Sequence, residues 1–177
     1  GQGSQSVGMG KALCEASRAA RRVFEEADEI LGFPLSRICF DGPEAELKRT
    51  AITQPAILTH SIAALEDLRD RFPERLDGAS LAAGHSLGEY SANVAAGALP
   101  FARAVALVHA RGRFMQEAVP EGVGAMAAIV GLAADAVDEA CRESAGGEVV
   151  SPANYNSPEQ TVIAGHAAAV ARASEAC

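Results

Sequence analysis

The stretch Ala79–Ala83 and the pentapeptide that follows it, Gly84-His85-Ser86-Leu87-Gly88, decide how the fold of this chain is interpreted. The first is a short apolar run, and a helix-like stretch over 87–96 follows the pentapeptide. This order predicts a strand, a tight turn and a helix, the arrangement that exposes a nucleophilic serine on a strained turn. The helix N-terminus would direct free N–H groups toward an oxygen that becomes negative during attack on a carbonyl. The sequence therefore predicts acyl transfer or hydrolysis through an ester of Ser86; the alternative is a glycine-rich turn whose serine only caps the helix.

Composition and charge narrow the class of protein. The chain has 177 residues, 49% of them apolar and 21% charged, which predicts one domain, or one and a fraction, with a real core. The net charge of −8 and the absence of a basic run exclude nucleic acid as an expected partner. The apolar runs are too short to span a membrane, so we expect no membrane partner. The scattered cysteines show no C-x-x-C spacing and favour a reducing cytoplasm; they are Cys14, Cys39, Cys141 and Cys177.

Periodicity predicts helices around the serine motif. Apolar residues recur on one helical face over 18–31, and Gly32 ends that helix. A second helix is expected to begin at Thr53-Gln54-Pro55 and to carry a wide apolar stripe as far as residue 68. A third should begin at Pro100 and run to about Ala118. Together with the strand before Ser86, these helices predict an α/β layer architecture.

The pattern changes at Glu121. Strands are predicted over 124–130, 148–154 and 161–164, and helices over 133–143 and 167–176. This βαββα order is typical of a ferredoxin-like unit that lacks its last strand. The sequence therefore predicts two domains, 1–121 and 122–177, both incomplete.

Two local patterns fail on spacing. The glycines before Lys11 suggest a phosphate loop, but Gln5 and Ala12 stand where the motif requires Gly and Ser or Thr. The four histidines lie far apart without an i, i+4 pair, so we expect no metal site; they are His60, His85, His109 and His166. His85 precedes the nucleophile and is expected to point away from it rather than act as its base.

Six motifs in order resemble bacterial malonyl-CoA:acyl carrier protein transacylases over essentially the whole chain. They are GQGSQ at 1–5, TQPA at 53–56, GHSLGEY at 84–90, RGRFMQ at 111–116, GAMAA at 124–128 and NYNSP at 154–158. The resemblance implies an α/β-hydrolase-like large subdomain interrupted by a ferredoxin-like small one. This agrees with the elements predicted from periodicity.

The resemblance also implies roles for particular residues. Ser86 would take the malonyl group from coenzyme A, and the backbone N–H groups of Leu87 and Gln2 would bind the oxyanion. Arg111 would pair with the free malonate carboxylate, because a guanidinium matches a carboxylate in two parallel bonds. Without the surrounding motif, Arg111 would be read as a solvated helix-surface arginine. Met115, one turn further on, is expected to form pocket wall or core.

Other implied roles concern pantetheine, the base and the partners. Asn154 and Asn156 would bond the pantetheine amides, or else simply form a turn. In the family a later histidine accepts the serine proton, and the chain ends at Cys177 before that position. We therefore expect a piece of a longer transacylase that is inactive alone. Its partners would be malonyl-CoA, as a thioester substrate, and acyl carrier protein, with no other cofactor.

Three alternatives stay open. An acyltransferase domain of a polyketide or fatty-acid synthase shares the serine motif and the arginine. A serine esterase or lipase predicts a His-Gly-Gly-type loop and no use for Arg111. A non-catalytic fragment would only bind carrier protein. Because the chain is acidic overall, docking of an acidic carrier would need a local basic patch, for which the candidates are Arg18, Arg21, Arg22, Arg111 and Arg113.

Overall fold

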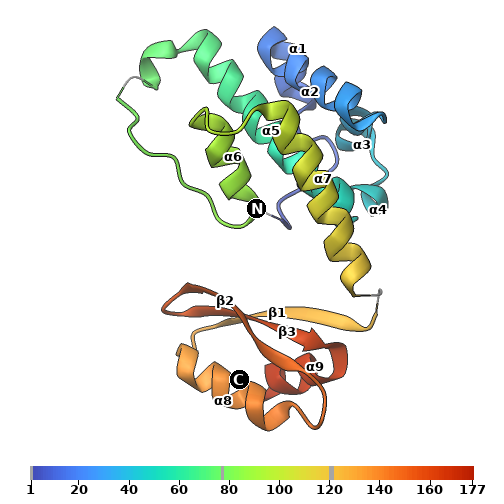
Figure 1. Cartoon of the computed structure of the whole chain (residues 1–177), viewed down its shortest axis with the longest axis vertical. Helices are drawn as coiled ribbons and strands as arrows, with labels where there is room; N and C mark the ends of the chain where they lie inside the picture. The colour runs from blue at the N-terminus through green and yellow to red at the C-terminus, as the bar shows by residue number, and fades with distance from the viewer. Residues whose placement is uncertain (1, 77, 120–121) are drawn as a thin grey trace. The chain divides into compact units, whose positions relative to one another are not determined.

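Residues 2–76, 78–119 and 122–177 are described by the computed structural model shown in Figure 1. Gly1, in the predicted N-terminal loop, and Glu121, the predicted domain limit, lie outside the described residues. The chain divides into two units, Gly1–Glu117 and Ala118–Cys177, each with its own hydrophobic core.

Among the described residues of the first unit, the regular elements are all helices. Two long helices, α2 and α5, pack against each other, and α6 packs against α5. The elements are α1 Lys11–Ala16, α2 Arg18–Leu31, α3 Leu35–Asp41, α4 Glu44–Leu47, α5 Thr50–Arg71, the short 3-10 helix η1 Pro73–Arg75, α6 Leu87–Ala95 and α7 Phe101–Ala118.

The bounds predicted for α2 are confirmed. The Ser17 hydroxyl accepts a hydrogen bond from the N–H of Ala20 at 3.2 Å and so caps the helix start. Gly32 ends the helix in a left-handed conformation with φ of 71°, which glycine adopts without strain. The apolar face that includes Phe24 and Ala27 is buried in the core.

The start of α5 differs from the prediction. The helix begins at Thr50 rather than Thr53, so Pro55 lies inside it. A proline there has no N–H to donate to the carbonyl four residues earlier, which is that of Ala51. The ring nitrogen Nδ1 of His109 lies 3.0 Å from this oxygen and supplies a donor from another helix. The rule that places proline in the first turn failed here because a distant side chain satisfies the freed carbonyl.

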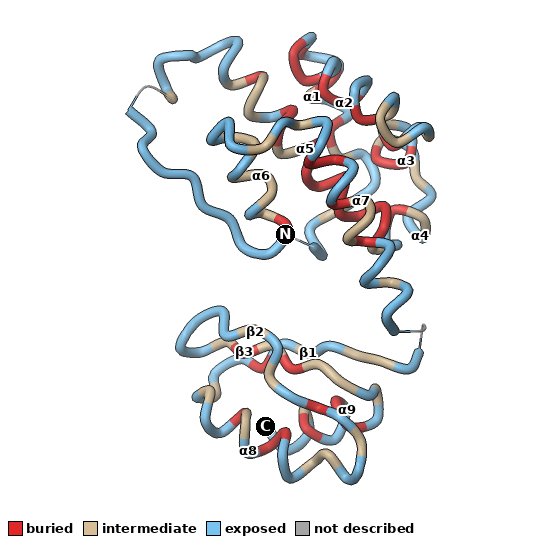
Figure 2. The backbone as a smooth tube through the Cα atoms, viewed as in Figure 1, coloured by how far each residue is buried: buried red, intermediate tan, exposed pale blue. Residues whose placement is uncertain are grey.

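Helix α5 is also more deeply buried than the single apolar stripe predicted for it. All residues from Ala51 to Thr59 are buried, polar ones included (Figure 2). The first half of α5 is therefore enclosed on every side, as expected for the central helix of a unit.

The strand predicted over 79–83 is not formed. These residues belong to no helix or strand, and Leu81 is 93% exposed. A strand is stabilised by neighbouring strands, and among the described residues of the first unit there is none to pair with it. The prediction from a short apolar run was wrong for this chain in isolation, whereas the turn and helix after it are present.

The second unit confirms the βαββα order. Strands β1 (Gly124–Val130), β2 (Val150–Ser157) and β3 (Gln160–His166) form an antiparallel sheet in the order β1-β3-β2. Helices α8 (Ala134–Ser144) and α9 (Ala167–Ala176) cover one face of it (Figure 1). The core between helices and sheet contains Ile163, Val137 and Ala169, all fully buried.

The buried thiols give a first testable expectation. Cys14, Cys39 and Cys141 are buried and free, and burial raises the pKa of Cys39 to about 12 and that of Cys14 to about 11. Because the reactive form is the thiolate, these thiols should resist alkylation in the native protein and react after unfolding. Mass-spectrometric peptide mapping after brief iodoacetamide treatment would show this. Alkylation of Cys39 at the same rate with and without denaturant would contradict it.

Candidate active site

Ser86 occupies a strained turn at the start of α6. Its backbone has a φ of 54° and a ψ of −107°. Among the described residues, Ser86 is the only one other than glycine with a positive φ, a conformation that is strained for a residue with a side chain. The turn depends on Gly84, because a Cβ there would lie 2.0 Å from the carbonyl oxygen of Gly88. The sequence predicted this strained geometry, and the structure shows it.

The Ser86 hydroxyl does not cap the helix that follows. Ser86 is the N-cap residue of α6, yet its side chain makes no capping hydrogen bond. Its Oγ instead accepts a hydrogen bond of 2.9 Å from Nη2 of Arg111. The side chain is exposed and directed toward a cation, so the interpretation of Ser86 as a simple cap does not hold.

Arg111 is brought to the serine from α7, 25 residues further along the chain. Its Nη1 donates to Oε1 of Gln54 at 2.8 Å, and its Cζ lies 5.9 Å from the ring centre of Tyr90. A buried amide and an aromatic ring therefore hold the guanidinium beside Ser86. This arrangement excludes the alternative of a solvated surface arginine.

Gln54 is a site residue that the sequence analysis did not single out. It is fully buried, and its Nε2 donates to Sδ of Met115 at 3.1 Å while its Oε1 accepts from Arg111. One amide thus orients both side chains that α7 presents at this point. The available signal was a glutamine at the start of an apolar helix, because a buried amide needs partners.

The helices α5 and α7 cross closely next to these contacts. A Cβ on Gly112 would lie 2.6 Å from the Thr50 carbonyl oxygen and 2.8 Å from Cα of Ala51. Only glycine permits this approach, and it places Arg111 within reach of Gln54.

The other predicted site residues are placed as follows. Leu87 is the first residue of α6, where backbone N–H groups have no acceptor within the helix. Gln2 is exposed, and its side chain donates to Oγ1 of Thr50 at 3.4 Å. Asn154 and Asn156 lie on β2 of the second unit, where Nδ2 of Asn156 donates to the Gln160 side chain at 3.0 Å. Their predicted roles at an oxyanion and at pantetheine stay predictions.

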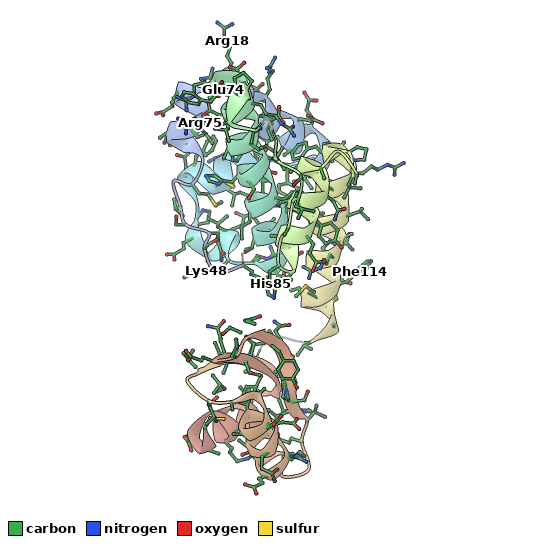
Figure 3. All side chains as sticks on the ribbon, turned by 90° about the vertical axis from the view of Figure 1, so that its left-hand side faces the viewer. Arg18, Lys48, Glu74, Arg75, His85 and Phe114 are labelled. Atoms are coloured by element: carbon green, nitrogen blue, oxygen red, sulfur yellow. The ribbon has the colours of Figure 1, made fainter. Side chains whose placement is uncertain are left out.

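No histidine within the described residues hydrogen-bonds Ser86 Oγ. The carbonyl of His85 accepts from the N–H of Gly88, and its side chain is exposed at the surface (Figure 3). Burial lowers the pKa of His60, and Nδ1 of His166 accepts from the N–H of Val149. The described residues contain no cluster of three or more metal-binding side chains and no helix long and apolar enough to cross a membrane.

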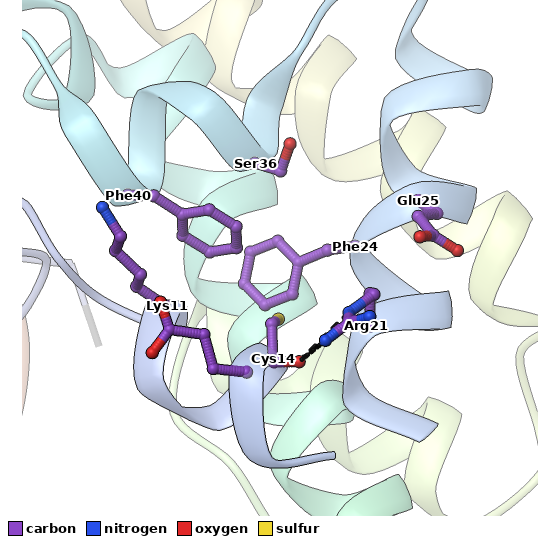
Figure 4. Close-up of a pocket in the computed structure, with 8 residues that line it drawn as sticks. Lys11, Cys14, Arg21, Phe24, Glu25, Ser36 and Phe40 are labelled. Carbon is purple, nitrogen blue, oxygen red and sulfur yellow. Dashed lines mark hydrogen bonds between the residues drawn. The ribbon is translucent and has the colours of Figure 1, made fainter. Parts of the chain in front are cut away.

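A separate cavity of about 270 Å³ lies between α1, α2 and α3 (Figure 4). Phe24, Phe40 and Cys14 contribute its apolar lining. The cations at its edge are already engaged: Lys11 pairs with Asp41 at 2.9 Å, and the guanidinium of Arg21 donates to the Cys14 carbonyl. The hydrogen bond and the negative charge of Asp41 raise the pKa of Lys11.

Comparison with known proteins shows the family to which this chain belongs. A family model described as the acyl transferase domain matches residues 1–177. The chain belongs to the acyl transferase family. It is 51% identical over its full length to the malonyl CoA-acyl carrier protein transacylase of Escherichia coli, and 52% identical over 176 residues to that of Bacillus subtilis. It spans 56% and 54% of these two relatives, a little over half of their length.

Solved structures of similar acyl transferases support the same assignment. An acyl carrier protein S-malonyltransferase from Vibrio cholerae is 48% identical and superposes with a TM-score of 0.89, covering 100% of this chain and 57% of that one. A malonyl-transacylase in complex with a type II PKS acyl-carrier protein is 50% identical, also with a TM-score of 0.89, covering 100% and 56%. The likeness confirms the predicted two-subdomain α/β fold of the family.

The close approach of Gly84 to the backbone of Gly88 predicts that one added methyl group will lower the stability of this acyl transferase chain. Gly84→Ala should destabilise the protein by about 1–3 kcal/mol, because the new Cβ overlaps the backbone at Gly88. Gly88→Ala is the matched control, since a Cβ there meets no atom within 4 Å among the described residues. Thermal unfolding of the two variants would test this, and equal melting temperatures would contradict the crowding at Gly84.

Proposed function

We propose that the full-length protein transfers a malonyl group from malonyl-CoA to the pantetheine thiol of acyl carrier protein. The transfer proceeds through an ester on Ser86 and supplies extender units for fatty-acid synthesis. The observation that carries this proposal is the 2.9 Å hydrogen bond between Arg111 and Ser86 Oγ, which places a fixed cation beside the nucleophile. The names of the relatives support the same reaction.

In the first half-reaction, Ser86 Oγ attacks the thioester carbonyl of malonyl-CoA. The hydroxyl proton passes to a base, the carbon–sulfur bond breaks, and the departing sulfur receives that proton, which releases coenzyme A as a thiol. In the second half-reaction, the carrier thiol attacks the ester carbonyl. The thiol proton passes to the base, the carbon–oxygen bond breaks, and the departing Ser86 oxygen receives that proton.

The negative oxygen of each tetrahedral intermediate needs N–H donors. The N–H of Leu87 at the α6 start is the first proposed donor, because the residue following the nucleophile fills this role at such turns. The N–H of Gln2 is the second. Each such donor typically lowers the barrier by about 2.7–4 kcal/mol.

Selectivity for malonyl over a neutral acyl group is assigned to Arg111. The malonyl carboxylate lies one methylene beyond the carbonyl that Ser86 attacks. Nη2 of Arg111 lies 2.9 Å from Ser86 Oγ, so the guanidinium is close enough to reach that carboxylate. We propose that the guanidinium exchanges its bond to Ser86 for two bonds to the carboxylate while Gln54 keeps it oriented. A neutral ester substrate would leave this cation unpaired, which argues against the esterase alternative.

We also propose a general base for Ser86, contacts to pantetheine and a cytoplasmic location. The base for Ser86 would be the histidine that the family resemblance places after position 177. Asn154 and Asn156 would bond the pantetheine amides, and coenzyme A enters only as part of the substrate. Free, buried cysteines are typical of a reducing compartment, which supports a cytoplasmic enzyme.

Carrier docking is proposed at a local basic patch. Arg18, Arg21 and Arg22 are exposed on the first turns of α2 and form this patch. Arg113 is exposed on α7 beside Glu117, next to Phe114, which lies far from Arg18 in Figure 3, so Arg113 is not part of the same patch. Acidic carrier proteins would be attracted to such a patch despite the net negative charge of the chain. The structure of a similar malonyl-transacylase with its carrier protein supports carrier protein as the partner.

Gln54→Glu in the full-length protein tests the role of the buried amide. The new carboxylate would pair with Arg111 and compete with malonate, so kcat/KM for malonyl-CoA should fall at least about tenfold. Acetyl-CoA transfer should change little, because acetyl has no carboxylate for Arg111 to bind. Steady-state transfer to carrier protein from both thioesters would measure this. A parallel loss for the two would show that Gln54 only supports packing.

A further inference from the structure

The backbone of α5 has one carbonyl whose normal donor is missing. Pro55 has no N–H, so the oxygen of Ala51 cannot form its helical hydrogen bond. Nδ1 of His109 on α7 lies 3.0 Å from this oxygen. Ala51 is buried, so water cannot easily replace the imidazole, and an unpaired carbonyl there would be costly.

The imidazole of His109 is held in place for this bond. Its ring packs against Phe33, with ring centres 5.6 Å apart and planes tilted by 53°. The Ala51 oxygen can only accept, so the bond requires the proton on Nδ1 of His109. His109 is half-buried and touches neither Ser86 nor Arg111 through any hydrogen bond found in the described residues.

The bond lies at the helix crossing on which the Arg111 contacts depend. His109 and Gly112, one turn apart on α7, both meet the backbone at Ala51. Arg111 lies between them in sequence and reaches Gln54, the next turn of α5. A change of spacing at Ala51 would therefore move the guanidinium relative to Gln54.

We infer that His109 is a positioning residue for Arg111. It supplies the donor that Pro55 removes from α5, and so fixes the α5–α7 crossing that holds Arg111 beside Ser86. The hydrogen bond between His109 and Ala51 is taken from the structure alone. The expected consequence, a change in malonyl selectivity, rests on the proposed function.

Three substitutions in the full-length protein separate this role from simple packing. His109→Leu removes the donor and keeps an apolar side chain of similar bulk. His109→Asn keeps an N–H near the position of Nδ1. Pro55→Ala returns a backbone N–H to α5, which can donate to Ala51 and make the histidine dispensable.

The kinetic readout is kcat/KM for malonyl-CoA and for acetyl-CoA. His109→Leu should lower the malonyl value about fivefold to tenfold, the scale of one net hydrogen bond, and change the acetyl value less than about twofold. His109→Asn should recover most of the loss. In the Pro55→Ala background, His109→Leu should have no further effect. Parallel losses for both substrates, or an equal loss in both backgrounds, would overturn the inference.

The unfolding readout does not depend on the reaction. A double-mutant cycle in Tm between His109→Leu and Pro55→Ala should show strong coupling, because each change matters only in the absence of the other donor. Additive Tm shifts would overturn the hydrogen bond even if malonyl transfer fails altogether. If His109→Leu alone does not fold, the double variant should still fold like Pro55→Ala, and its failure to fold would also overturn the inference.

Discussion

Ser86→Ala in the full-length protein is expected to abolish formation of a malonyl ester and to reduce transfer to carrier protein by up to about a millionfold, the scale known for loss of a serine nucleophile. The hydroxyl is exposed on a strained turn, does not cap α6 and is bonded to Arg111. No other serine combines these features in the described part of the chain. Incubation with labelled malonyl-CoA, followed by peptide mapping, measures the effect.

The control for this experiment is Ser91→Ala, which removes a hydroxyl from the same helix and should label like the unmodified protein. A label on a peptide without Ser86, or full labelling of Ser86→Ala, would show that the nucleophile is a different residue.

Arg111→Ala should change substrate preference more than any other substitution. A hydrogen bond to a charged group contributes about 1.5–3 kcal/mol, so loss of the guanidinium should lower kcat/KM for malonyl-CoA by about 10-fold to 150-fold. Transfer of acetyl should be unchanged or faster, because acetyl-CoA leaves the cation of the unmodified enzyme unpaired. Competition between the two thioesters for transfer to carrier protein would measure the change in preference.

Two further variants sharpen this test. Arg111→Lys keeps the charge but loses the planar fork, so it should recover only part of the malonyl activity. Arg113→Ala, on the same helix but exposed and 3.5 Å from Glu117, should leave the preference unchanged. An equal loss of malonyl and acetyl transfer in Arg111→Ala would show that Arg111 only supports the fold.

The sequence was sufficient where local chemistry determines structure. The glycine and serine spacing at 84–88 predicted a strained turn, and the apolar face over 18–31 with Gly32 after it predicted the bounds of α2. The βαββα order of the second unit followed from apolar runs of the right length. In each case an element is predicted from residues that are close together in the sequence.

The sequence was insufficient where a distant partner decides the outcome. The start of α5 was misplaced because His109, far along the chain, satisfies the carbonyl that Pro55 frees. The strand over 79–83 was predicted from its own composition, whereas strand formation requires neighbours. Gln54 was missed as a site residue because its importance comes from contacts with α7, and a glutamine at the start of an apolar helix was its one local signal.

The central claim is that Arg111 recognises the carboxylate of an acyl group carried on Ser86. A crystal structure of the full-length protein trapped as its malonyl ester tests this most directly. We predict that Nη1 and Nη2 of Arg111 lie about 2.7–2.9 Å from the two carboxylate oxygens of an ester on Ser86 Oγ. An ester on Ser86 whose carboxylate points into solvent, with Arg111 still bonded only to Gln54, would contradict the account.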